Sequence, residues 1–175
     1  AATRGSYVDA ASSVSSLVVD GTNNTFKISV DGVSSGTISL PQKAYGSATE
    51  LAAELQSRIN GDSALRAAVV SVLVSFDGTR FTFTSERYGS ASKVAITEVG
   101  INGAVIGLTT TGTSTDGEDV AGTIGGIAAT GSGQYLTGSG AAEGLQILVE
   151  GTATGDRGTV TFTRGVADRL SSLLD

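Results

Sequence analysis

The sequence lacks cysteine, histidine, methionine and tryptophan altogether and has a single proline. Without imidazole or thiolate groups, the chain has neither the usual bases and nucleophiles of hydrolases nor the ordinary ligands of zinc, copper or haem iron. Without cysteine, no disulfide can stabilise the fold, so its stability must come from packing or from neighbouring subunits. We therefore predict a protein that is not an enzyme and has no catalytic, cofactor-binding or metal-binding residues.

Charged residues make up only 16% of the chain, and Asp and Glu outnumber Lys and Arg by 17 to 11, which gives a net charge of −6. This sign is wrong for a surface that must neutralise nucleic-acid phosphates or anionic lipid head groups. The sequence also has no apolar run long enough to span a bilayer. We expect no nucleic acid and no membrane among its partners.

Aromatic residues are scarce at 5%, whereas hydrophobic residues reach 39%, so the core must be aliphatic. Glycine is abundant, with 25 residues, together with Ser, Thr and Ala, a composition typical of strands joined by tight turns. The chain starts with neither an initiator Met nor the pattern of a cleaved signal peptide. We expect an excised piece of a longer β-rich protein that is extracellular or part of an assembly.

The first clear pattern is an alternation of apolar and polar residues at Phe26, Ile28 and Val30. Asp31-Gly32 then supplies a turn that tolerates positive φ, and the alternation resumes over 38–40. This predicts a hairpin with a longish loop. The first fifteen or so residues are small, polar and aperiodic, so we expect them to form a tail or an edge segment.

A helix is predicted at about 47–60. The stretch Ser47-Ala48-Thr49-Glu50 is a capping box, in which the serine hydroxyl accepts from a helical amide and the glutamate reaches back. Asn60-Gly61 is expected to give a left-handed stop, with a second short helical turn around residues 64–66. Apolar side chains recur at every fourth position, at Leu51, Leu55 and Ile59.

A second hairpin is predicted from Val69–Phe76, which is rich in β-branched residues, through a turn at Asp77-Gly78 to Phe81 and Phe83. A further strand follows at 94–96. The order over residues 25–99 is therefore ββαβββ. The fold class is α+β and predominantly β, with antiparallel sheets, one amphipathic covering helix and a second small β unit.

The chain is expected to divide into residues 1–112, the ββαβββ domain, and residues 113–175, a second β-rich unit. Between them, Gly100–Gly117 is read as a linker or crossover because it is rich in Thr, Ser and Gly. Strands of the second unit are predicted at Val120–Ile127, Gln134–Leu136, Leu145–Val149 and Thr159–Thr163. Helical spacing of Val166, Leu170, Leu173 and Leu174 predicts a truncated helix that continues in the parent chain as a longer helix or a coiled coil.

Several motifs have both a functional and a structural interpretation, and the structural one is favoured for each. The glycine clusters at 122–126 and 131–133 lack phosphate-loop spacing and are typical of turns. Asp116-Gly117-Glu118-Asp119 offers carboxylates for calcium but not the spacing of an EF-hand loop. The spacing of the glutamates gives no support for a glycosidase; they are Glu86, Glu98, Glu143 and Glu150. The lysines lie in predicted strands or loops, where a solvated surface side chain is preferred over the base of a serine–lysine hydrolase; they are Lys27, Lys43 and Lys93.

Two further short motifs are ambiguous in the sequence. Asp156-Arg157, flanked by glycines, is either an interface contact or a hairpin tip kept soluble by its charges, and the tip is favoured. Asn23-Asn24-Thr25 matches a glycosylation sequon, although a turn is the preferred interpretation.

Several of these stretches resemble known flagellar proteins. The first half resembles the flagellin IN motif of flagellins and hook-associated proteins, in TNNTFKISVDG (22–32), ISL (38–40), LAAELQ (51–56) and RFTFTS (80–85). The second half resembles the flagellar filament cap family, hook-associated protein 2, in DVAGTIGG (119–126), GSGQYLTG (131–138) and GDRGTVTF (155–162). Together these stretches cover most of residues 17–175.

The resemblance implies a fragment of the head domains of the cap, with residues 164–175 leading toward the leg domain. Proteins of this family leave the cell unfolded through the flagellar type III secretion apparatus, without a cleaved signal peptide, and fold outside. Their partners are flagellin and other cap subunits, with which they form a ring at the filament tip that helps flagellin fold and polymerise. The long terminal helices that mediate this assembly are missing from this sequence.

Alternative functions remain open at this stage. A surface adhesin or glycan-binding β module would use exposed Thr/Ser/Gly loops and tyrosines such as Tyr88 and Tyr135 to contact a host surface glycan or mucin. Flagellin itself or another hook-associated protein is the nearest rival within the same group. A hydrolase is the least favoured class.

Overall fold

The computed structural model describes residues 1–10 and 14–161. A first part, here called the core unit (residues 1–10 and 14–117), contains two packed sheets and both α-helices. Its elements are β1 (Arg4–Val8), β2 (Thr25–Val30), β3 (Val33–Ser34), β4 (Ile38–Ser39), α1 (Ala48–Gly61), α2 (Ser63–Ala67), β5 (Val72–Phe76), β6 (Phe81–Tyr88), β7 (Val94–Val99), the 3₁₀ helix η1 (Gly103–Ile106) and β8 (Thr113–Thr115).

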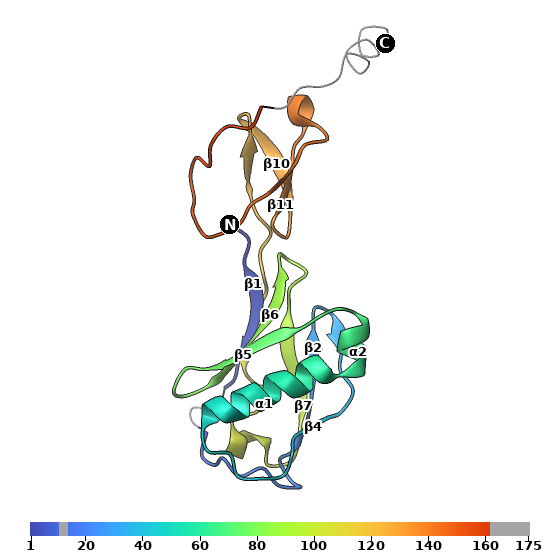
Figure 1. The fold of residues 1–175 in the computed structure, drawn as a ribbon, viewed down its shortest axis with the longest axis vertical. Helices are drawn as coiled ribbons and strands as arrows, with labels where there is room; N and C mark the ends of the chain where they lie inside the picture. Colours follow the sequence, from blue (N-terminus) through green and yellow to red (C-terminus); the bar gives the residue numbers. More distant parts are fainter. Residues whose placement is uncertain (11–13, 162–175) are drawn as a thin grey trace.

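A second part, here called the sheet unit (residues 118–150), is a single small sheet. It contains β9 (Gly122–Ile124), β10 (Ile127–Ser132), β11 (Tyr135–Thr137), the 3₁₀ helix η2 (Gly140–Ala142) and β12 (Gln146–Leu148). Figure 1 shows the two units at opposite ends of an elongated molecule, with β1 and β6 running from the core unit toward the sheet unit.

All strand pairs are antiparallel, as the sequence predicts. One sheet has the order β5-β6-β1-β8; in a second, β2 pairs with β3, β4 and β7; and the sheet unit has the order β12-β11-β10-β9. The fold class is therefore confirmed as α+β and predominantly β, with one main helix and one short helix. Within the described residues, no helix has the length and apolarity needed to cross a membrane.

The hairpin turn at Asp31-Gly32 is confirmed by backbone angles. Both residues have positive φ, 52° and 84°, which is the conformation of the two-residue turns that match the twist of antiparallel strands. The returning strand is split into β3 and β4 because the Ser35 hydroxyl, rather than a backbone carbonyl, accepts the Ile28 N–H at 3.0 Å. The longish loop of the prediction is thus a tight turn followed by an interruption.

The start of α1 follows the predicted capping box. The Ser47 hydroxyl accepts from the Glu50 N–H at 3.1 Å, and the Glu50 carboxylate reaches back to the Gly46 N–H at 2.8 Å. That N–H lowers the pKa of Glu50, and the hydrogen bond from Lys43 lowers it further. Capping of this kind satisfies amides that have no partner inside the helix.

The predicted left-handed stop of α1 is wrong. Gly61 belongs to the helix, and Asp62 both ends α1 and caps α2, since its carboxylate accepts from the amides of Ala64 and Leu65. Asn60 has a different role: its side-chain amide exchanges two hydrogen bonds of 2.9 Å with the backbone of Val72 on β5. The chain needs no positive φ here because a side chain supplies the next cap.

Helix α1 also closes an edge of the sheet. β5 is an edge strand, and its Val74 N–H donates to the Gln56 side chain at 2.9 Å, beside the Asn60 contacts. Edge-strand amides that are satisfied in this way cannot pair with the strand of another molecule. The helix therefore protects the edge as well as covering the core.

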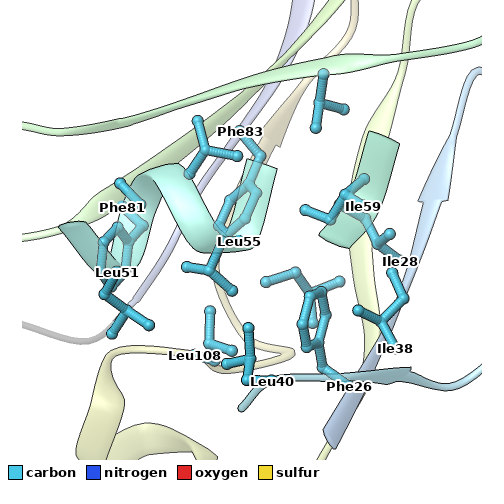
Figure 2. Close-up of a cluster of buried hydrophobic side chains, with 14 of the residues drawn as sticks. Phe26, Ile28, Ile38, Leu40, Leu51, Leu55, Ile59, Phe81, Phe83 and Leu108 are labelled. Carbon is cyan, nitrogen blue, oxygen red and sulfur yellow. The ribbon is translucent and has the colours of Figure 1, made fainter. Parts of the chain in front are cut away.

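The hydrophobic core lies between α1 and the two sheets of the core unit. Figure 2 shows the side chains that α1 contributes, Leu51, Leu55 and Ile59, gathered with residues from β2, β4 and β6. Each is essentially without solvent exposure. Burial of one such side chain stabilises the fold by about 1.5–3 kcal/mol, so this helix face is the main link between the sheets.

The N-terminal segment is not the predicted tail or edge. β1 is an inner strand, between β6 and β8, and its Tyr7 ring is buried. The Tyr7 hydroxyl donates to the Thr109 carbonyl at 2.6 Å and accepts from the Gly112 N–H at 2.8 Å. The residues of β1 that face inward include Gly5, which has no side chain, so the sequence lacks the aliphatic alternation of a buried strand.

Of the two interpretations of Gly100–Gly117, the linker is wrong, because the segment is a crossover from β7 in one sheet to β8 in the other. Ile106 and Leu108 are fully buried in the core, and the Asp9 carboxylate accepts from the amide and the hydroxyl of Thr109, each at 2.8 Å. β8, which the sequence assigns to the second unit, pairs with β1. A polar threonine strand can lie at a sheet edge with its side chains in water, which is why its composition resembled a linker.

The strands predicted for the second unit are found in shortened form. A turn at Gly125-Gly126, with φ of 60° and 81°, separates β9 from β10 inside the region predicted as one strand. Residues 159–161 are not in a strand, and the rest of the predicted strand Thr159–Thr163 lies outside the described residues. The predicted C-terminal helix over 164–175 lies outside them too.

Candidate functional site: the cleft between the two units

The sheet unit is joined to the core unit through the carboxylate of Asp119. Asp119 accepts hydrogen bonds from the Ser90 hydroxyl at 2.6 Å, from the Ser90 N–H at 3.2 Å and from the Gly133 N–H at 2.6 Å. Ser90 lies between β6 and β7, and Gly133 lies between β10 and β11. One side chain thus connects the turns of both units, and we call these three residues the Asp119 clamp.

The clamp favours the ionised form of Asp119. Its pKa is lowered, chiefly by the Ser90 hydroxyl and then by the N–H groups of Gly133 and Ser90. Hydrogen bonds to a carboxylate stabilise the charged form, so protonation must weaken them. The clamp is therefore strongest above the pKa that Asp119 has in an unfolded chain.

The backbones of the two units approach closely beside the clamp. A Cβ atom added to Gly89, whose φ is 96°, would lie 2.6 Å from the Gly133 Cα atom. Within the sheet unit itself, a Cβ atom on Gly131 would lie 1.7 Å from the Val120 carbonyl oxygen. The Val120 N–H also donates to the Gly133 carbonyl at 2.9 Å. Glycine is required here because any side chain would separate the two turns.

A cleft of about 450 Å³ lies at this junction. The end of β6 supplies Glu86, Arg87 and Tyr88 to one wall, and the turn into β11 supplies Gln134 and Tyr135 to the other. Asp119 and the Ser90 side of the clamp complete it. The two tyrosines that the sequence analysis named as glycan contacts therefore line one and the same cleft.

The tyrosines differ in their surroundings. The Tyr88 ring lies under the Arg4 guanidinium, whose carbon is 4.6 Å from the ring centre, so a cation holds one face of the ring. Tyr135 is 48% exposed and stands opposite Leu148 of β12. One wall of the cleft is thus fixed by a cation contact, and the other presents an aromatic ring to solvent.

A second hollow, of about 580 Å³, lies between β4 and α1. Polar groups around it are already paired within the protein: Arg58 forms an ion pair with Glu54 at 2.7 Å, and Asp62 accepts from the Gly36 N–H at 3.2 Å. No aromatic side chain is among its described lining residues. The junction cleft is therefore the better candidate site, although it is smaller.

The acidic residues considered in the sequence face separate partners. In the acidic stretch 116–119, Asp116 pairs with Lys93 at 2.7 Å and Asp119 belongs to the clamp. These two carboxylates therefore bind different partners. Glu86 accepts from the Ser71 hydroxyl, and Glu98 pairs with Lys27 at 2.8 Å. Within residues 1–10 and 14–161, no group of three acidic side chains is placed to hold a metal ion. Glu143 and Glu150 lie in the sheet unit.

The remaining candidates have structural roles. The Asn23 side chain is buried, with its oxygen accepting from the Asp20 N–H at 2.9 Å and its nitrogen donating to the Val18 carbonyl at 3.2 Å, so the predicted turn is confirmed. Lys43 pairs with Glu50 at 3.1 Å.

The predicted hairpin tip at Asp156-Arg157 is wrong, because residues 149–161 contain no strand. Arg157 instead donates to the carbonyls of Glu150 and Ala153, both at 2.6 Å. Asp156 accepts from the Gly158 N–H at 2.9 Å. These bonds give the segment a local loop structure without a partner strand.

Sequence reasoning missed the clamp and the cleft as a unit. Asp119 was considered for calcium and as the start of a stretch that resembles the cap family, and neither Ser90 nor Arg4 was considered as a contact. The sequence pattern that could have indicated the clamp is that Asp119 occurs together with recurring glycines in the second half of the chain. Neither a scan against models of protein families nor a search of curated proteins found a match to the chain.

Proposed function

We propose that the chain is a structural module of the bacterial flagellar filament cap, a part of the head that stands at the distal end of the filament and assists flagellin folding and polymerisation. Its partners in this role are flagellin and other cap subunits, and it acts outside the cell after export through the flagellar secretion apparatus. The proposal rests on the resemblance of its motifs, together with the places that those motifs occupy in the fold.

The observation that carries the proposal is that both groups of motifs coincide with elements that build the molecule. The stretches that resemble the IN motif form β2, β4, α1 and β6, which supply much of the core. The stretches that resemble the cap family include Asp119 and Gly133, which join the two units. The motifs therefore mark positions that set the shape of the molecule rather than a reaction centre.

Such a module works through its shape and surfaces. A chain without disulfides can be exported unfolded and can fold outside the cell without an oxidising step. The core unit has a large core of its own, which suits folding without assistance, and the elongated arrangement of two units offers faces to more than one neighbour.

The test is to extend the chain on both sides with the parent gene and to measure the mass of each form in solution by light scattering. We expect residues 1–175 to be monomeric and the extended chain to form rings and to promote flagellin polymerisation at filament ends. Stable rings from residues 1–175 alone would contradict the proposal that segments outside this stretch mediate assembly. An extended chain without helices would favour a free-standing adhesin.

A second function, glycan binding at a bacterial surface, is favoured by one specific observation. Tyr88 and Tyr135 come from different units and yet line the same cleft. The two functions are compatible, because a module at the tip of a filament is exposed to whatever surface the filament meets.

A further inference from the structure

We propose that the cleft between the core unit and the sheet unit binds an uncharged saccharide, with Tyr135 as the main contact. This inference rests on the second of the two proposed functions and is independent of the first. It goes beyond that function because it assigns the site, the class of ligand and the residue whose removal should weaken binding most.

The tyrosine rings on the two walls of the cleft can contact a sugar ring. The face of a tyrosine ring carries partial negative charge, and it attracts the polarised C–H groups on the less polar side of a sugar ring. Tyr135 is half exposed, so it can be covered by a ligand without moving. Arg4 occupies one face of Tyr88, so a ligand meets the other face or the hydroxyl edge of that ring.

The polar side chains supply the second part. Sugar hydroxyls both donate and accept hydrogen bonds, and the cleft offers donors and acceptors side by side. Arg87 can only donate, Glu86 can only accept when ionised, and the Gln134 amide can do both. A mixed set of this kind around aromatic rings suits a polyhydroxylated ligand better than an apolar one.

Charge decides between neutral and acidic sugars. The lining residues include two acids, Glu86 and Asp119, and one base, Arg87, and the Arg4 guanidinium lies against the ring of Tyr88. The whole chain carries −6. Two acids and two bases leave the cleft without the excess positive charge that a sialylated or sulfated glycan requires. The geometry therefore favours an uncharged glycan.

The Asp119 clamp gives the site its rigidity. The two walls belong to different units, and their separation is set by the hydrogen bonds of Asp119 to Ser90 and Gly133. A site whose walls are already held apart loses little freedom when a ligand enters. Binding should in turn make the junction harder to open, because the ligand contacts both walls.

The experiment is to place the chain on an array that carries neutral, sialylated and sulfated oligosaccharides, and then to titrate the strongest neutral glycan by calorimetry. We expect binding to neutral glycans and at least a tenfold loss of affinity in Tyr135→Ala, with Tyr135→Phe within about threefold of the parent chain. Ile127→Ala is the matched control, because Ile127 is a similarly exposed sheet-unit residue outside the cleft. Its affinity should not change.

Three results would overturn the proposal: no neutral glycan bound, preference for sialylated or sulfated glycans, or unchanged affinity in Tyr135→Ala. Circular dichroism of each variant shows whether it is folded, and Tyr88→Ala serves as a second test if Tyr135→Ala is not. Displacement of the glycan by flagellin would indicate a protein site instead. Ring formation by the extended chain is measured separately, so failure of sugar binding leaves the cap proposal standing.

Discussion

The core unit and the sheet unit are both made of antiparallel strands, but they are stabilised in different ways. The buried hydrophobic cluster lies entirely within residues 7–108. Among the described residues after 108, only Val120 and Leu136 are buried hydrophobic side chains. Ile127, Tyr135 and Leu148 remain about half exposed.

This difference shows that strand pairing alone does not account for the sheet unit. A small sheet needs a hydrophobic face that packs on something else to be stable in water. The sheet unit has little such packing, so its position depends on the Asp119 clamp and on the close approach of Gly89 to Gly133. The core unit, in contrast, contains the hydrophobic packing that its own stability requires. The following predictions test that contrast.

The largest effect is expected from a core substitution. Phe83 of β6 is fully buried in the core, and Phe83→Ala should lower the free energy of unfolding of the core unit by about 3–5 kcal/mol. Leu136→Ala in the sheet unit should leave the unfolding of the core unit unchanged. Urea unfolding followed by circular dichroism compares the two, and equal losses would contradict the contrast.

A glycine substitution should affect the sheet unit selectively. Gly131→Ala places a methyl group where the Val120 carbonyl stands, so β10 must move away from the segment before β9. We expect large amide chemical-shift changes in β9–β11 and none in α1 or β2. Gly122→Ala is the control, because its added Cβ meets only the tip of Leu136 at 3.4 Å. Shifts confined to the immediate neighbours of residue 131 would argue against the selective effect.

Removal of the cap of α1 should lower the stability of the core unit alone. Ser47→Ala removes the acceptor for the Glu50 N–H and should lower the stability of the core unit by about 0.5–2 kcal/mol. Ser57→Ala, at an exposed position within α1, should be neutral or slightly stabilising because alanine favours helices. Thermal unfolding of both variants provides the measurement. A loss in Ser57→Ala as large as in Ser47→Ala would show that capping is not the cause.

The smallest effect on stability is expected when the pH is lowered. The pKa of Asp119 is lower in the folded chain than in the unfolded chain, so the clamp contributes its full stability above the unfolded pKa and loses it as pH falls through the folded pKa. The Gly133 amide resonance should report this titration, and Asp119→Asn should abolish it. A midpoint at or above the ordinary aspartate pKa would contradict the clamp.

Much of the core unit could be predicted from the sequence because its signals are local. Aliphatic alternation at Phe26 and Ile28, the cap at Ser47 and the turn at Asp31-Gly32 each act within a few residues. β1 could not be predicted in this way. It is buried through Tyr7, whose hydroxyl bonds to Thr109 and Gly112, residues that are distant in the sequence.

The cleft was predictable only in part. The sequence suggested Tyr88 and Tyr135 as contacts of a glycan-binding module, but nothing local in the sequence places them together. Their meeting depends on Asp119, whose partners are distant in the chain, and on glycines that allow the two turns to touch. Such tertiary contacts follow from packing rather than from periodicity.

Native-state hydrogen exchange at increasing denaturant tests the central claim most directly, because it gives an opening free energy for each strand. The account predicts that amides of β10 and β11 exchange through an opening of clearly lower free energy than those of β2, β6 and α1. Amides of both units that share one opening free energy would contradict it, since the chain would then unfold as a single body without a weak junction.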